Sequence, residues 1–169
     1  MATLVEPATA PCWHHVPLVV TTERPTQFID LTDRLEALVA GLNLQTGLLN
    51  LQTRHTTTGL IVNEHEPLLL SDFAITLGRI APSARRYRHD DARVRTVNVM
   101  PDERVNGHAH CRALILPTAV TLNIVHGRID LGRWQRVFFV ELDGPLERAL
   151  SVVITGATGQ AYATGQAYL

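Results

Sequence analysis

Hydrophobic residues recur along this chain at two spacings, and each spacing predicts a different kind of element. Within residues 31–42 the apolar positions fall three or four residues apart, which is the spacing of one buried face of a helix. Asp30 suits the N-terminal cap of that helix, and Gly41 suits its end. Glu66 and Pro67 predict the start of a second helix, because proline is favoured in the first helical turn. Its buried stripe comprises Leu69, Phe73, Leu77 and Ile80.

Short stretches rich in β-branched and aromatic residues, bounded by turn residues, predict the strands. They cover residues 13–22, 46–55, 60–64, 119–127, 134–142 and 150–156. The polar, arginine-rich segment 82–106 predicts a long loop, and a loop of that length in a compact domain is often functional. Residues 108–117 fit a helix or a strand. This order of elements predicts an α+β fold with a mainly antiparallel sheet and two or three helices.

The predicted elements form a single domain over residues 13–156. Residues 1–12, with three alanines and two prolines, predict a loose N-terminal arm, and residues 157–169 predict a low-complexity tail in which ATGQAY occurs twice. No apolar run approaches the roughly 20 residues of a membrane-spanning helix, and the N-terminus lacks the features of a signal peptide. We therefore expect a cytoplasmic protein with no membrane partner.

Composition narrows the possible chemistry mainly by exclusion. The formal net charge is -1, so no overall field attracts the chain to nucleic acid. All 15 basic residues are arginine, which excludes a Schiff-base lysine and the lysine of a phosphate-binding P-loop. Cys12 and Cys111 form no CxxC pair, which excludes a zinc ribbon, and we expect both thiols to be reduced and buried.

Histidines between residues 55 and 110 are the main candidates for chemistry, because five of the eight in the chain lie there: His55, His65, His89, His108 and His110. Histidine is the commonest metal ligand and the usual general base near neutral pH. His108 and His110 form an HxH pair. In a strand both side chains face one side, whereas in a helix they lie about 200° apart, so the conformation of this segment decides whether both reach one site.

Four sequence blocks together resemble one known family. RHTTTGLIVNEHEP (residues 54–67) resembles the HTT/HTS…NEN signature of the YjbQ family, also called the secondary thiamine-phosphate synthase family. YRHDD (87–91), NGHAHCRALILP (106–117) and GRIDLGRWQRVFFVEL (127–142) are similar to three further blocks of that family, in the same order and spacing. The resemblance covers roughly residues 13–156.

This resemblance implies a trimeric α+β fold with clefts between subunits. It also implies a weak thiamine-phosphate synthase activity, which joins a thiazole phosphate to a pyrimidine diphosphate. The polar site positions of the family match His55, Asn63, Glu64, His89 and His110, and its Trp-Gln pair matches Trp134 and Gln135. The chain departs from the family pattern at His108, where many members have aspartate, and at Arg133, where threonine is usual.

His55, His89 and His110 are the predicted ligands of a divalent metal, with zinc as the first choice and magnesium as the second. Three neutral imidazoles with an open fourth position form a reasonable catalytic zinc site, which activates water or binds phosphate oxygens. The structural alternative is that His55 caps a hairpin and His89 is a solvated loop residue. His65 is predicted to be a surface residue.

Glu64, Asn63 and His108 are the predicted catalytic residues. Glu64 ends an apolar strand, where partial burial would raise its pKa and suit acid–base work or a fourth metal ligand. The alternative role of Glu64 is a contact with the N-terminus of the helix after Pro67. Asn63 either orients a substrate or holds the turn. His108 either replaces the aspartate of the family or leaves that role to another residue.

Arg112, Trp134 and Gln135 are the predicted substrate-binding residues. Arginine suits phosphate because of its bidentate fork, and Arg112 lies beside His110 in the sequence. Trp134 either stacks on an aromatic ring of the substrate or belongs to the core. The arginines of the long loop are interpreted mainly as solvated side chains: Arg85, Arg86, Arg88, Arg93 and Arg95.

Two functions from different classes follow from these residues. The first is an enzyme that transfers or cleaves a small phosphorylated metabolite at a histidine-rich, metal-containing cleft between subunits. The second is a non-catalytic trimeric protein that binds a metal or a phosphorylated metabolite. A structural protein without any site is a third possibility, and it predicts neither metal nor anion at the three histidines.

Overall fold

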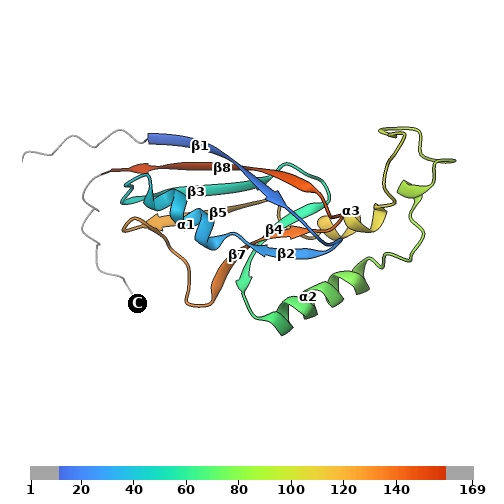
Figure 1. The fold of residues 1–169 in the computed structure, drawn as a ribbon, viewed down its shortest axis with the longest axis horizontal. Coiled ribbons are helices and arrows are strands. Elements are labelled where there is room, and N and C mark those ends of the chain that lie inside the picture. The colour runs from blue at the N-terminus through green and yellow to red at the C-terminus, as the bar shows by residue number, and fades with distance from the viewer. Residues whose placement is uncertain (1–11, 159–169) are drawn as a thin grey trace, which may run out of the picture.

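The computed structural model describes residues 12–158, which fold into two antiparallel sheets and three α-helices (Figure 1). This confirms the predicted α+β class. The predicted arm and tail lie almost entirely outside the described residues. No helix within residues 12–158 is long and apolar enough to cross a membrane.

The larger sheet has five strands in the order β1-β8-β3-β5-β6, and every neighbouring pair is antiparallel. Its strands are β1 (Cys12–Thr21), β3 (Thr46–Thr53), β5 (Ala119–Val125), β6 (Arg128–Ile129) and β8 (Glu147–Ala157). Along β8 every second residue from Arg148 to Ile154 is buried, as expected for a sheet with one covered face. This strand begins three residues before the predicted start at residue 150.

The smaller sheet has three strands in the order β2-β7-β4. They are β2 (Gln27–Asp30), β4 (Thr58–Glu64) and β7 (Gln135–Glu141). The central strand β7 is buried without interruption from Val137 to Glu141, because both of its faces are covered. The strand β2 was not predicted from the sequence, and all four of its residues are half-buried.

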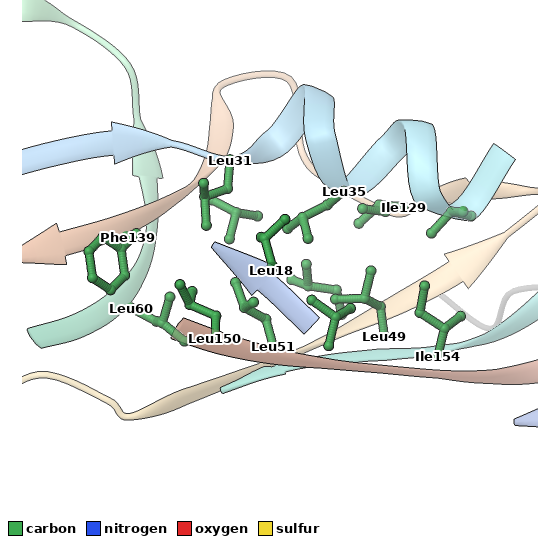
Figure 2. Close-up of a cluster of buried hydrophobic side chains, with 14 of the residues drawn as sticks. Leu18, Leu31, Leu35, Leu49, Leu51, Leu60, Ile129, Phe139, Leu150 and Ile154 are labelled. Atoms are coloured by element: carbon green, nitrogen blue, oxygen red, sulfur yellow. The ribbon is translucent and has the colours of Figure 1, made fainter. Parts of the chain in front are cut away.

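The main core lies between the larger sheet, the strand β7 and the helix α1 (Thr32–Ala40), as Figure 2 shows. Leu35 and Val39 of α1 are fully buried, which confirms the helical spacing in the sequence. Asp30 precedes the helix, and its carboxylate accepts a hydrogen bond from the Thr32 N–H at 2.9 Å. Apolar burial of this kind stabilises a domain by roughly 1.5–3 kcal/mol for each large side chain.

The helix α2 (Pro67–Ile80) begins where the sequence predicts. Glu66 is its N-cap, and the Glu66 carboxylate accepts hydrogen bonds from the backbone N–H groups of Leu68 and Leu69. The predicted buried stripe is only partly correct, because Leu77 is the one buried residue of α2 and Ile80 is 48% exposed. Through Leu77, the C-terminal part of α2 contributes to a small second hydrophobic cluster, which also contains Ala109, Val140 and Leu142.

Candidate functional site

The segment that was ambiguous in the sequence forms a helix, α3 (Gly107–Ala113). Ala109 is fully buried, and His108 and His110 lie about 100° to either side of it, so both are half-buried. Cys111 is exposed, so the expectation of a buried thiol is wrong there, because the helix turns Ala109 and Arg112 inward instead. Cys12 is half-buried.

A 3-10 turn, η1 (Arg88–Asp90), holds His89 against α3. The Asp90 carboxylate accepts hydrogen bonds from the backbone N–H groups of Asn106 at 3.1 Å and Gly107 at 2.9 Å. A Cβ atom on Gly107 would lie 2.6 Å from the Cβ of Tyr87, so only glycine permits this approach. The long loop 82–106 is therefore fastened to the start of α3 at a defined point, and from there it extends away from the sheets (Figure 1).

This anchoring brings His89 and His110 together, and we refer to these two residues as the histidine pair. Their ring centroids are 4.6 Å apart with an interplanar angle of 34°. The Nδ1 atom of His89 accepts a hydrogen bond from Nη1 of Arg95 at 3.1 Å, and Arg95 also forms an ion pair with Glu103. A cleft of about 260 Å³ opens beside His89, beneath residues 92–105.

Burial keeps the histidines of α3 neutral near pH 7. Desolvation lowers the pKa of His110 below its usual value, and the neighbouring His89 lowers it further. Desolvation also lowers the pKa of His108, with a second contribution from the positive charge of Arg112. A neutral imidazole retains a lone pair, so both residues suit a metal ligand or a proton acceptor.

Asn106 and Asp143 complete the polar surroundings of α3. The Nδ2 atom of Asn106 donates a hydrogen bond to Asp143 at 2.9 Å, while its Oδ1 atom is buried and has no partner within residues 12–158. A buried carbonyl oxygen without a partner is costly, which points to a water, ion or ligand group at this position. Neither residue was predicted as part of the site, although Asn106 begins the sequence block that contains both histidines of α3.

His55 follows β3 and lies near a buried ion pair. Its Nε2 atom accepts a hydrogen bond from the Ala149 N–H at 2.9 Å, so Nδ1 is the nitrogen left for another partner. Desolvation lowers the pKa of His55, and the charge of Arg148 lowers it further. Arg148 donates two hydrogen bonds, of 2.7 Å and 2.6 Å, to the fully buried Glu141. The alternative in which His55 has a structural role is thus consistent with its contact to β8.

The other predicted site residues lie at the opposite end of β4. Asn63 and Glu64 end this strand, and Glu64 pairs with Gln135 of β7. The expectation that Glu64 is partly buried is wrong, because β4 is an edge strand and its last residue is exposed. His65 is exposed, as predicted, and contacts Asp30 at 2.8 Å. Six residue steps along β4 separate Thr58 from Glu64, or about 20 Å.

Trp134 and Arg112 have very different environments. Trp134 is 61% exposed and stacks under the Arg133 guanidinium at 4.7 Å, so it does not belong to the core. Arg112 is buried, and it donates from Nε to the Ala81 carbonyl and from Nη1 to the Thr26 hydroxyl. Burial lowers the pKa of Arg112. Among the described residues, Nη2 and one hydrogen of Nη1 of Arg112 have no partner and remain for the phosphate contact that the sequence predicts.

The structure therefore divides the predicted site into two groups within one chain. The helix α3, which carries His108 and His110, contacts η1 and β4, and His55 lies three residues before β4, whereas Asn63 and Glu64 end β4 beside Gln135. Within residues 12–158, no group of three or more His, Cys, Asp or Glu side chains is arranged to hold a metal ion. A three-ligand metal site is not preassembled in this part of the single chain.

These features define a class: an α+β domain of two antiparallel sheets in which a helix and a long anchored loop bring two histidine rings together. The family described as "UPF0047 protein YjbQ-like" matches residues 17–157, and the chain belongs to that family. A curated relative from Methanothermobacter thermautotrophicus is 33% identical over 82% of this chain and 90% of its own length. One from Archaeoglobus fulgidus is 34% identical over 80% of this chain and 96% of its own length.

Solved structures agree with this assignment. A YbjQ-like protein of unknown function from Sulfolobus solfataricus P2 superposes with a TM-score of 0.76 at 28% identity, covering 87% of this chain and 99% of its own. A hypothetical protein from Aeropyrum pernix K1 superposes with a TM-score of 0.74 at 33% identity, covering 85% of this chain and 98% of its own. The family resemblance seen in the sequence is thereby confirmed. The descriptions of these relatives assign no activity.

Proposed function

We propose that this protein is an enzyme acting on a small phosphorylated metabolite, at a histidine site that is completed by a second copy of the chain. The activity implied by the family resemblance is thiamine-phosphate synthesis. In that reaction a thiazole nitrogen forms a bond to the methylene carbon of the pyrimidine, and the bond from that carbon to the diphosphate oxygen breaks. The observation that carries the proposal is the histidine pair, whose rings lie 4.6 Å apart beside a cleft, with the pKa of His110 lowered by burial.

The histidine pair fits a divalent metal better than the other predicted ligands do. Two imidazoles that share one zinc ion place their ring centres about 5 Å apart, and the rings of His89 and His110 are 4.6 Å apart. Neither ring nitrogen of His110 has a hydrogen-bond partner among the described residues. His89 can act as a ligand together with His110 once Arg95 no longer donates to the Nδ1 atom of His89. Arg95 would then keep its 2.8 Å ion pair with Glu103.

His55 and a residue from another subunit complete the ligand set in this proposal. His55 offers Nδ1, because its Nε2 is bonded to the backbone of Ala149. Zinc is the first choice because imidazole nitrogen suits it, and magnesium is the second. The bound metal would supply positive charge to phosphate oxygens.

Assembly would explain why Asn63 and Glu64 lie at the end of β4, about 20 Å along the strand from Thr58, and not beside the histidine pair. We propose a trimer in which Asn63 and Glu64 of one copy face the histidine pair of the next. In that cleft Glu64 accepts or donates a proton, Asn63 and Gln135 orient the substrate, and Trp134 offers an exposed aromatic face for stacking. His108, which is neutral near pH 7, acts as a second proton acceptor beside Asp143.

The experiment is a direct assay for thiamine phosphate with the purified protein, the two precursors and either zinc or magnesium. A dedicated synthase run in parallel controls for precursor quality. The proposal predicts slow product formation that falls at least tenfold in His110→Ala and is unchanged in His15→Ala, an exposed histidine on β1. No product from the wild-type protein would sink the assignment of this activity.

A non-catalytic binding protein is the second candidate, and one observation favours it. Glu64 is exposed, and no carboxylate among the described residues lies within hydrogen-bond distance of the His110 ring. A binding protein loses metal or ligand in His110→Ala but has no turnover to lose. Metal analysis of His110→Ala and His15→Ala, together with the activity assay, separates the enzyme from the binding protein.

A further inference from the structure

A second cleft, of about 590 Å³, lies on the loop that carries His89. Its charged lining is predominantly basic: it contains four arginines and two aspartates, a net charge of +2 in a chain whose overall charge is -1. We call this cavity the arginine cleft, and its charged residues are Arg85, Arg86, Arg88, Asp90, Asp91 and Arg93.

Both carboxylates of the arginine cleft are already occupied. Asp91 forms a two-pronged ion pair with Arg93, with contacts of 2.8 Å and 2.7 Å. One oxygen of Asp90 accepts the two backbone hydrogen bonds from Asn106 and Gly107 that fasten the loop to α3. Asp91 is thus engaged mainly by Arg93, with an additional electrostatic interaction with Arg86, and the net charge of the lining stays at +2 with both aspartates counted.

Arg86 and Arg88 are the side chains that this arrangement leaves without a partner. Both are exposed, and neither guanidinium makes a hydrogen bond or ion pair with another residue in the described part of the chain. Arg85 lies over the ring of Tyr87 at 5.6 Å, and the Tyr87 hydroxyl donates to the Pro82 carbonyl. Three positive charges within four residues repel one another, and an anion bound between them removes that repulsion.

The position of the arginine cleft connects it to the histidine pair. Asp90 and Val105 line both this cleft and the smaller one beside His89, so the two cavities share a wall. The turn η1 lies between them and is fixed by the contacts of Asp90. The arginine cleft is therefore adjacent to the cleft beside His89, with Asp90 and Val105 between them.

We propose that the arginine cleft is a binding site for the phosphate or diphosphate group of a small metabolite, with Arg86 and Arg88 as its principal contacts. The planar guanidinium fork matches two phosphate oxygens at once. The volume falls in the range of small-ligand sites. The overall charge of -1 does not attract a nucleic-acid backbone to the molecule as a whole, which favours a small ligand.

Binding of an anion here does not depend on the activity proposed above, but its purpose does. Where the proposed function holds, the arginine cleft binds the phosphorylated end of the substrate while the histidine pair faces the reacting end. The role of the arginine cleft in holding a substrate therefore rests on the proposed function. The experiment below measures anion binding alone, so its failure is distinguishable from failure of the catalytic assay.

Titration calorimetry with inorganic pyrophosphate and with orthophosphate tests the site. The full chain should bind pyrophosphate saturably, and more tightly than orthophosphate, because two guanidinium groups engage the longer anion. Removal of two charge-assisted contacts in the double variant Arg86→Ala/Arg88→Ala should raise the Kd by about tenfold or more. Arg128→Ala, which removes an exposed arginine at the far end of the larger sheet, should leave the Kd unchanged.

Two further variants and one further ligand make the outcome decisive. Arg86→Lys/Arg88→Lys keeps the charge but loses the forks, so it should bind between the wild type and the alanine variant. His15→Ala, which removes an exposed histidine of β1, should bind pyrophosphate as the wild type does. The proposal is overturned if pyrophosphate does not bind saturably, if the alanine variant binds as tightly as the wild type, or if a short single-stranded oligonucleotide binds more tightly than pyrophosphate.

Discussion

Replacement of Arg148 by methionine should be among the most destabilising single changes in this chain. Glu141 is fully buried and Arg148 is 7% exposed, and the two share a bidentate ion pair. Removing one partner of a buried pair leaves an uncompensated charge and typically costs about 3–5 kcal/mol. Thr22 and the backbone N–H groups of Leu142 and Asp143 still donate to Glu141, which places the expected cost near the lower end, about 3 kcal/mol.

The pH dependence of this cost follows from the Glu141 carboxyl. Burial alone would raise its pKa, but the hydrogen bonds from Arg148 and the backbone hold the pKa below its usual value. The stability that the pair contributes is therefore present above the unfolded-state pKa and is lost as the pH falls through the folded-state pKa. The difference in unfolding free energy between the wild type and Arg148→Met should accordingly be larger at pH 7.5 than at pH 4.

Urea denaturation at a fixed protein concentration measures this difference. A loss of about 3 kcal/mol corresponds to a fall in Tm of roughly 6–12 °C for a domain of this size. The double variant Arg148→Met/Glu141→Gln is the matched control, because it removes the buried charge and should recover about half of the loss. A cost for Arg148→Met below about 1 kcal/mol, or one that does not change with pH, would refute the reasoning.

Three further predictions concern the loop, the helix cap and the histidines. Gly107→Ala should cost about 1–3 kcal/mol in urea denaturation, because its Cβ would lie 2.6 Å from the Cβ of Tyr87; an unchanged midpoint would contradict the anchoring. Glu66→Ala should cost about 1 kcal/mol through loss of the α2 cap, whereas the exposed Glu64→Ala should change the midpoint little. Because burial lowers the pKa of His110, its contribution to stability is complete above the unfolded-state pKa and is lost as the pH falls. The stability of His110→Asn should therefore fall less than that of the wild type between pH 7.5 and pH 5, as urea midpoints at both pH values will show.

The elements with strong periodicity could be predicted from the sequence, and those defined by tertiary contacts could not. The helix α1 has apolar residues at helical spacing, and Leu35 and Val39 are buried as that spacing requires. The strand β2 has only four residues, all half-buried, so no alternation marks it. The helix α3 was ambiguous because its buried positions are Gly107, Ala109 and Arg112, which do not form an apolar pattern.

The candidate site shows the same division. Residue chemistry and the family resemblance placed His89 and His110 in one set, and the structure stacks their rings. That contact depends on the hydrogen bonds of Asp90 to α3, which no local pattern reveals. The burial of Glu64 was predicted wrongly because a sequence does not show which strand lies at the edge of a sheet.

Metal content of the isolated protein tests the central claim most directly, since that claim makes the histidine pair the core of a metal-containing site. The measurement is elemental analysis of untagged wild type, His110→Ala and the surface control His15→Ala, expressed in medium with zinc. The account predicts bound divalent metal in the wild type and in His15→Ala, and its loss in His110→Ala. A metal-free wild type, or a His110→Ala variant that retains as much metal as the wild type, would contradict it.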